Sequence, residues 1–258
     1  MTQRMPALFI GHGSPLNAVT ENRYSGAWAA IGRRVPTPTA ILVVSAHWYV
    51  PGVRVTAMQR PRTIHDFGGF PQALYNMQYP APGDPALAQK IAGILSPAPV
   101  VLDTDWGLDH GTWSVLCHAF PEADIPVLQL SINTELTPAA HYELGQRLSA
   151  LRDAGILIIG SGNVVHNLQR YAWRDDNAAP QEWAQQFENA IVEHLEKNND
   201  KALIDYPSMP GAELAIPTPE HYLPLLYIAA LRHDGESVSL PLTGIAGGSI
   251  SMLSMQVG

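Results

Sequence analysis

Two stretches of this sequence set the expected architecture: Leu8-Phe9-Ile10-Gly11-His12-Gly13-Ser14-Pro15 and Ile41-Leu42-Val43-Val44-Ser45-Ala46-His47-Trp48. Each is a short apolar run that ends at a histidine, and such runs are typical of strands buried on both faces. Ligand sites of open α/β sheets lie just beyond the carboxyl ends of the strands. We therefore expect His12 and His47 to lie at one sheet edge, within reach of a single metal ion.

Similar apolar runs recur along the chain and alternate with segments of helical periodicity. The expected strands are 6–10, 40–46, 53–58, 99–102, 125–131, 155–160, 236–242 and 249–256. Helices are indicated by apolar residues at helical spacing over 144–151 and 183–195, and helix starts by Asp84-Pro85, Thr137-Pro138 and Thr218-Pro219. The alternation predicts an α/β fold: a single domain, residues 1–258, with a central mixed sheet flanked by helices and a metal site at the strand carboxyl ends.

Residues 59–85 form the longest stretch without clear periodicity. The segment is rich in Pro and Gly but also contains several aromatic residues, which argue against disorder. Loops of this length are usually functional or disordered. We expect an ordered loop that covers a site.

Composition narrows the class of protein. The chain carries 15 basic and 23 acidic residues, a formal net charge of -8, which disfavours nucleic acid as a partner. Its single cysteine excludes an internal disulfide and a thiolate-rich metal site, so a metal must use His, Asp or Glu. The apolar runs are too short to span a bilayer. We expect a cytoplasmic protein without a membrane partner and without an organic cofactor.

Three further histidines lie near glycine turns or capping residues. His166 follows the apolar run that ends in Gly160-Ser161-Gly162, His221 follows Thr218-Pro219, and His110 precedes Gly111. Small residues at a strand end allow another group to approach closely. Capping by Thr218 predicts that His221 lies in the first turn of a helix, where the helix dipole disfavours its protonation. Each is a candidate for the site.

The remaining histidines differ in their surroundings. His118, His141, His194 and His233 lie in helical segments with no strand end or glycine turn nearby, so we expect structural roles for them. His65 lies in the 59–85 loop, where it is a candidate substrate contact or the partner of a hydrogen bond with Asp66. Phe67 is a candidate for an aromatic pocket wall, although such residues are more often core.

Six motifs follow one another in order over nearly the whole chain: Gly11-His12-Gly13-Ser14-Pro15, Ser45-Ala46-His47-Trp48, His65-Asp66-Phe67-Gly68-Gly69-Phe70-Pro71, Asp109-His110-Gly111, Ser161-Gly162-Asn163-Val164-Val165-His166-Asn167 and Thr218-Pro219-Glu220-His221-Tyr222. Together they resemble the class III extradiol ring-cleaving dioxygenases of LigB type. Within that family the resemblance is to the branch of the DOPA 4,5-extradiol dioxygenases.

The resemblance implies an oxidoreductase that opens a catechol, such as L-DOPA, next to its diol with dioxygen. It implies one non-haem divalent metal ion, held by His12, His47 and His221, with His166 as a further ligand or as the acid–base residue and His110 as a second active-site histidine. Better-known members use a glutamate where His221 stands here. An all-imidazole set suits zinc as well as iron, so both Fe(2+) and Zn(2+) remain open.

Two other functions fit the residues. A zinc hydrolase would use a carboxylate near the metal, such as Glu220 or Asp109, as its base. A non-catalytic metal-binding relative of the same fold is the second alternative, because a fold does not by itself carry function. The sequence leaves the catechol undefined, since no residue is recognisable as a carboxylate clamp. It also leaves the oligomeric state open between a monomer and a small homo-oligomer.

Overall fold

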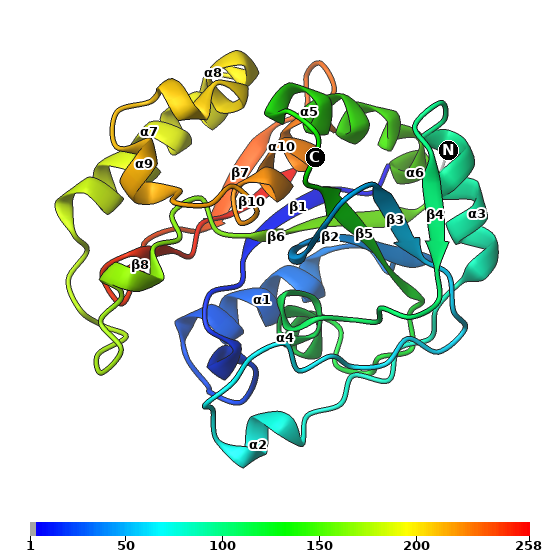
Figure 1. Ribbon diagram of the computed structural model, residues 1–258, viewed down its shortest axis with the longest axis horizontal. Helices are drawn as coiled ribbons and strands as arrows, with labels where there is room; N and C mark the ends of the chain where they lie inside the picture. Colours follow the sequence, from blue (N-terminus) through cyan, green and yellow to red (C-terminus); the bar gives the residue numbers. More distant parts are fainter. Residues whose placement is uncertain (1–3) are drawn as a thin grey trace.

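The computed structural model describes residues 4–258, and in this range the main sheet has eight strands in the order β4-β3-β5-β2-β6-β1-β10-β7 (Figure 1). The strands of this sheet are β1 (Ala7–Gly11), β2 (Ala40–Val50), β3 (Val53–Thr56), β4 (Val100–Asp103), β5 (Val127–Asn133), β6 (Ile156–Gly162), β7 (Val238–Leu242) and β10 (Ser254–Val257). Two short strands, β8 (Ile245–Ala246) and β9 (Ile250–Ser251), pair separately as an antiparallel hairpin.

The centre of the sheet is parallel. β5, β2, β6 and β1 are parallel neighbours, whereas β10 pairs antiparallel with both β1 and β7. On the other side, β3 is antiparallel to β5 and parallel to β4. The expected mixed sheet is confirmed, and the carboxyl ends of its four central strands lie at one edge.

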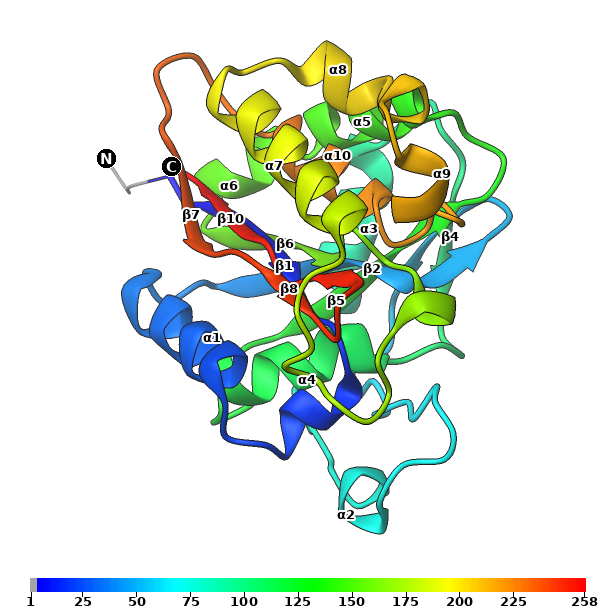
Figure 2. The same cartoon turned by 90° about the vertical axis from the view of Figure 1, so that its left-hand side faces the viewer.

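Helices cover both faces of the sheet. The helices α1 (Arg23–Arg34) and α4 (His110–Ala119) pack on one face, as Figures 1 and 2 show. The opposite face is covered by α3 (Pro85–Ile94), α5 (Pro138–Arg147), α6 (Ser149–Asp153), α7 (Glu182–Glu196), α8 (Asp200–Ile204), α9 (Ala212–Ala215) and α10 (Leu223–Ala229). The short helices η1 (Pro15–Ala18), α2 (Gln72–Tyr75), η2 (Leu168–Arg170) and η3 (Tyr206–Ser208) lie in the connections.

The alternation of side chains along each central strand creates two hydrophobic cores. Phe9 and Leu42 point into the core beneath α5 and α10, while their neighbours Leu8 and Ile41 point into the core beneath α1 and α4. Successive residues of a strand face opposite sides, so a strand buried on both faces must be apolar at every position. This requirement explains the uninterrupted apolar runs in the sequence.

Every expected strand is present; six of the eight have both ends within two residues of the expected bounds, and two differ further. The segment 249–256 forms two strands, β9 and β10, rather than one. The expectation that the second strand ends before His47 is wrong, because β2 continues to Val50. Between Val44 and Tyr49 β2 advances five residues while β5 advances two, so His47 lies on an irregular, bulged part of the strand.

The expected helix starts are correct in two cases of three. Asp84 and Thr137 accept hydrogen bonds from backbone N–H groups in the first turns of α3 and α5, each with a proline at the start. The start expected at Thr218-Pro219 is wrong. These residues form a turn instead, in which the N–H groups of Tyr222 and Leu223 donate to the Pro219 carbonyl, and α10 begins only at Leu223.

The 59–85 segment is an irregular loop that contains the short helix α2 and ends at Pro85, the first residue of α3. It is attached to the rest of the chain where the Ile64 N–H donates to the Leu108 carbonyl and the Leu108 N–H donates to the Arg62 carbonyl. Its aromatic residues Phe67 and Phe70 pack against the core beneath α1 and α4. None of the helices within residues 4–258 combines the length and apolar character needed to cross a bilayer.

An ion pair with a buried arginine links α6 to the segment that precedes β7. Arg152, at the end of α6, is fully buried, and its guanidinium donates two hydrogen bonds of 2.8 Å to the Glu236 carboxylate. It also donates to the carbonyls of Met5 and Leu231. Burial alone would raise the pKa of Glu236, but the hydrogen bonds from Arg152 and from the His233 N–H outweigh it and lower the pKa.

Replacing Glu236 with Gln is expected to lower the free energy of unfolding by roughly 2 kcal/mol at pH 7, because it leaves a buried guanidinium without its counter-charge. Because the pKa of Glu236 is lower in the folded than in the unfolded state, its charge stabilises the fold at pH values above the unfolded-state pKa of about 4.3. This stabilisation is lost as the pH falls through the folded-state pKa. Urea unfolding of both proteins across pH 3–7 should therefore show the difference shrinking in acid. Glu193→Gln, in an exposed pair with Lys197, is the control. An equal loss of unfolding free energy in Glu236→Gln and Glu193→Gln would contradict the stabilising role assigned to the Arg152–Glu236 pair.

Candidate metal centre and pocket

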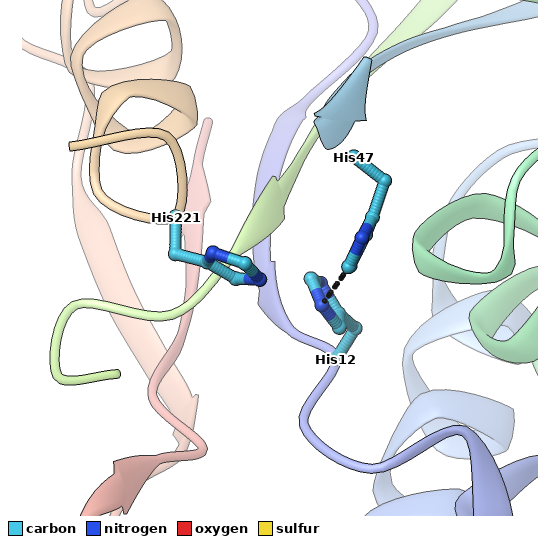
Figure 3. Close-up of side chains that lie close together, drawn as sticks. All are labelled: His12, His47 and His221. Carbon is cyan, nitrogen blue, oxygen red and sulfur yellow. Dashed lines mark hydrogen bonds between the residues drawn. The ribbon is translucent and has the colours of Figure 1, made fainter. Parts of the chain in front are cut away.

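Three imidazoles from distant parts of the chain meet at the carboxyl edge of the sheet. His12 directly follows β1, His47 lies on the bulged part of β2, and His221 lies in the turn before α10 (Figure 3). Their ring centroids are 4.9–5.4 Å apart, and one nitrogen of each lies within 4.8 Å of those of the other two. The two histidines expected to share an ion are thus adjacent, and His221 joins them.

The Nδ1 atoms of these histidines are all occupied by oxygen partners. Ser161 Oγ lies 3.0 Å from His12 Nδ1, Asp66 Oδ2 lies 3.3 Å from His47 Nδ1, and Glu220 Oε1 lies 3.0 Å from His221 Nδ1. Because the Ser161 hydroxyl donates its one proton to the Gly111 carbonyl, it accepts from His12. The two carboxylates are also acceptors. Each Nδ1 therefore carries the proton, and each Nε2 carries a lone pair.

The Nε2 atoms converge on one another, and those of His12 and His47 are in contact, as the dashed line in Figure 3 marks. His12 Nε2 and His47 Nε2 are 3.0 Å apart, and His221 Nε2 is buried without a hydrogen-bond partner. Lone pairs held this close repel one another unless a cation lies between them. Three neutral imidazoles that each present Nε2, with Nδ1 fixed by a second group, form the donor set expected for a divalent metal ion. The residues present therefore fit a metal.

Burial keeps these imidazoles neutral. It lowers the pKa of His12, His47 and His221 well below the usual value, and neighbouring histidines lower it further. The helix dipole expected to act on His221 does not provide the explanation, because His221 precedes α10 and lies in a turn. Desolvation and the adjacent imidazoles produce the same neutral state.

Close backbone approach explains how His221 reaches the site. A Cβ added at Gly162, the last residue of β6, would lie 2.2 Å from the His221 carbonyl oxygen. The next residue, Asn163, donates its N–H to that same carbonyl at 2.8 Å. The glycine expected to allow close approach therefore admits the backbone of the turn that carries His221.

His110 and Asp66 form a second layer beside His47. His110 is the first residue of α4, which is capped by the buried Asp109. Nδ1 of His110 lies 3.0 Å from Asp66 Oδ2, the oxygen that also faces His47. The backbone N–H of His110 donates to Asp66 Oδ1. Burial would raise the pKa of Asp66, but these histidine contacts outweigh it and lower it to about 2. Asp66 thus carries a negative charge that orients two rings at once.

Sequence reasoning missed the role of Asp66. It considered this residue only as a hydrogen-bond partner of its neighbour His65. His65 instead places Nε2 3.0 Å from the Met77 carbonyl and does not line the pocket, whereas Phe67 does. The signal for Asp66 in the sequence was its position in the motif His65-Asp66-Phe67-Gly68-Gly69-Phe70-Pro71, which also contains Phe67.

His166 lies beside the three imidazoles and forms a second group with Glu220 and His221, in which the candidate ligand atoms lie within 4.8 Å of one another. Its ring stacks on that of His221 with centroids 3.5 Å apart and an angle of 5° between planes. The hairpin of β8 and β9 fixes its backbone through a bridge to Ile250. Burial, and then the charge of His110, lowers the pKa of His166 to about 4. The ring is therefore neutral at pH 7.

These histidines form the floor of a cavity of about 240 Å³. Its walls are mainly apolar and come from the 59–85 loop and from the segment that follows β6. The lining residues include Phe67, Phe70, Leu168, Tyr171 and Trp173. The 59–85 loop thus contributes a wall of the site.

A family model described as the catalytic LigB subunit of aromatic ring-opening dioxygenase matches residues 6–242. The chain belongs to the LigB family. Among curated LigB-type relatives, a 4,5-DOPA dioxygenase extradiol from Escherichia coli (strain K12) is 51% identical, with 99% of this chain and 95% of that protein covered. One from Beta vulgaris is 40% identical over 84% of this chain and 83% of its own length.

A solved structure shares the fold of nearly the whole chain. The crystal structure of an uncharacterized protein from Escherichia coli K12 superimposes with a TM-score of 0.87 at 45% identity, covering 99% of this chain and 100% of that one. The family model and the curated relatives together confirm the expected resemblance to LigB-type extradiol dioxygenases over nearly the full chain.

Exchanging Glu220 for Gln is expected to weaken metal binding by roughly 10–100-fold, because the outer partner that holds the His221 Nδ1 proton loses its charge. Asp66→Asn should have a comparable effect through His47. Competition with a chromogenic chelator would measure both affinities for Zn(2+) and Fe(2+). Glu213→Gln, on the surface of α9, is the matched control, and affinities equal to wild type in both site variants would refute this arrangement.

Proposed function

We propose that this protein is an extradiol ring-cleaving dioxygenase that opens a catechol with dioxygen at one metal ion held by His12, His47 and His221. The observation that carries this proposal is the convergence of three imidazole Nε2 atoms at the floor of an aromatic-walled cavity. His221 Nε2 has no hydrogen-bond partner, and His12 Nε2 and His47 Nε2 lie 3.0 Å apart. Family membership supports the reaction class. L-DOPA, named for the relatives, belongs to the substrate class that we assign to this chain.

We further propose Fe(2+) as the working ion, with Zn(2+) as an ion that the same three imidazoles retain. The bound metal supplies Lewis-acid acidification of the catechol hydroxyls and the redox chemistry with dioxygen. The protein's contribution is to exclude water from the ring with its apolar walls and to hold the neutral imidazoles in place.

His166 is assigned the proton transfer. It lines the cavity next to His221, is neutral at pH 7, and lies outside the three-imidazole group. Its ring therefore accepts a proton from a catechol hydroxyl and returns one as the ring opens. A histidine with a pKa near 4 is a weak base, which suits a hydroxyl that has already been made more acidic.

His110 is assigned to hydrogen bonding of the substrate hydroxylate or of oxygen. Its Nδ1 faces Asp66 while its ring lines the cavity. Asp66 thereby fixes the orientation in which the other ring nitrogen is presented. A fixed ring needs no reorganisation when charge develops on the substrate.

The carboxylates argue against a zinc hydrolase. Asp109 is fully buried, and its oxygens accept from Ser45 and Gln129. Glu220 accepts from His221 and Thr218 and, like Asp109, does not line the cavity. Neither carboxylate is free to act as the base that activates a zinc-bound water.

Anaerobic reconstitution with Fe(2+), followed by catechols in air, is expected to give oxygen uptake and a yellow ring-opened product. The measurements are an oxygen electrode trace and the visible spectrum. The same protein loaded with Zn(2+) should take up no oxygen, and His233→Gln, outside the site, should behave as wild type. An iron-loaded protein that is silent with every catechol would overturn the dioxygenase assignment.

His166→Gln is expected to keep its metal while kcat for catechol cleavage falls roughly 100–1,000-fold, because general acid–base catalysis contributes on that scale. Metal content by atomic absorption and steady-state kinetics together test this. His110→Ala should instead alter the dependence of rate on oxygen concentration. Near-normal turnover of His166→Gln with full metal content would remove His166 from the mechanism.

A further inference from the structure

The mouth of the cavity is built from large apolar side chains that face solvent. Trp173 is 65% exposed, the highest value among the exposed large hydrophobic residues within 4–258, and Leu168 is 47% exposed. Both line the cavity. Exposed apolar side chains gathered at one site commonly mark a binding surface. Their position here, above the histidine floor, places them against the part of a ligand that extends away from the metal.

Two segments of the chain build the walls of the mouth. Phe67 and Phe70 come from the 59–85 loop, and Leu168, Tyr171 and Trp173 come from the segment after β6. Figure 2 shows this second segment, in yellow-green, descending in front of the sheet towards the cyan loop. The Tyr171 hydroxyl is already paired, since it donates to Asp176 Oδ1 at 2.6 Å. Only its ring is therefore offered to a ligand.

Charge is nearly absent from these walls. Among the described residues that line the cavity, none is Lys or Arg, and the one carboxylate is Asp66. Both Asp66 oxygens are engaged by His47 and His110. The Ser14 hydroxyl oxygen accepts from the Leu16 N–H. A carboxylate on the substrate tail that packed against these apolar side chains would give up hydration without gaining a cation, which is unfavourable.

From these features we infer that the preferred substrates are catechols with an uncharged apolar or aromatic substituent, which packs between Phe67, Leu168 and Trp173. This inference rests on the proposed function and narrows it. Amino-acid and carboxylic-acid catechols such as L-DOPA enter the same site but bind weakly, because apolar burial stabilises only the uncharged tail. Leu168 and Trp173 are thus specificity-determining residues, distinct from the histidines that hold the reacting diol.

A matched series of ligands tests the inference. The ligands 4-propylcatechol, 3-(3,4-dihydroxyphenyl)propanoate and L-DOPA share a three-carbon tail and differ in charge. With iron-loaded enzyme, kcat/KM for 4-propylcatechol should exceed the values for the propanoate and for L-DOPA at least tenfold. We expect this difference to arise from KM and not from kcat. A charged ligand that equals or exceeds 4-propylcatechol would overturn the inference.

Binding without turnover separates this inference from the proposed function. Anaerobic equilibrium dialysis with Zn(2+)-loaded protein should rank the three Kd values in the same order. Loss of turnover with this ranking intact counts against the dioxygenase assignment alone. Equal Kd values for the neutral and charged ligands count against the specificity assignment alone.

Surface variants at the mouth provide the second test. Leu168→Arg should raise kcat/KM for the propanoate at least fivefold by supplying the missing cation, and Trp173→Ala should weaken 4-propylcatechol more than unsubstituted catechol. Val101, 48% exposed on the edge strand β4 and outside the cavity lining, offers the matched controls Val101→Arg and Val101→Ala. If Val101→Arg raised the propanoate value as much as Leu168→Arg, a general charge effect would replace the proposed role.

Discussion

The site depends on the fixed orientation of three buried imidazoles. Ser161, Asp66 and Glu220 each engage one Nδ1 atom, so the Nε2 lone pairs of His12, His47 and His221 all point at the same place. A neutral imidazole can present either nitrogen, and its second partner decides which one. Without these three oxygens the same histidines would form a buried polar cluster with no defined metal-binding geometry.

The sheet and its glycines bring these partners together. β1, β2 and β6 are parallel neighbours, so His12, His47 and Ser161 reach one edge. Gly162 then allows the backbone of the turn at His221 to lie against the end of β6. A larger residue at this position would displace the turn, because its Cβ would meet backbone that has no rotamer to change. The arrangement of the three imidazoles is therefore set by strand order and by one close backbone contact.

The cavity divides its tasks between floor and mouth. The floor carries the histidines of the lining and Asp66, the one carboxylate among the described residues that line the cavity. The mouth comes from two connecting segments and is apolar. Sites built this way hold the reacting atoms on rigid elements while loops vary the rest of the ligand's surroundings. The reacting diol and the substrate tail consequently meet different surfaces of the cavity, although Asp66 and Phe67 come from one segment and His166 and Leu168 from another.

The sequence by itself determined the α/β class, the central strands and the importance of His12 and His47. Apolar runs buried on both faces leave few alternatives, and a histidine after such a run falls at the sheet edge. Ordered motifs extended the set to His221, His166 and His110 and indicated the family.

Only the tertiary structure decided which atoms meet. The bulge at His47 depends on pairing between β2 and β5, and the start of α10 at Leu223 depends on the turn that packs against Gly162. The preference of Thr218 for a helix start depends only on neighbouring residues, and these tertiary contacts override it. The joint contact of Asp66 with His47 and His110 links residues 19 and 44 positions apart. Such contacts follow from three-dimensional packing, which no local pattern of residues specifies.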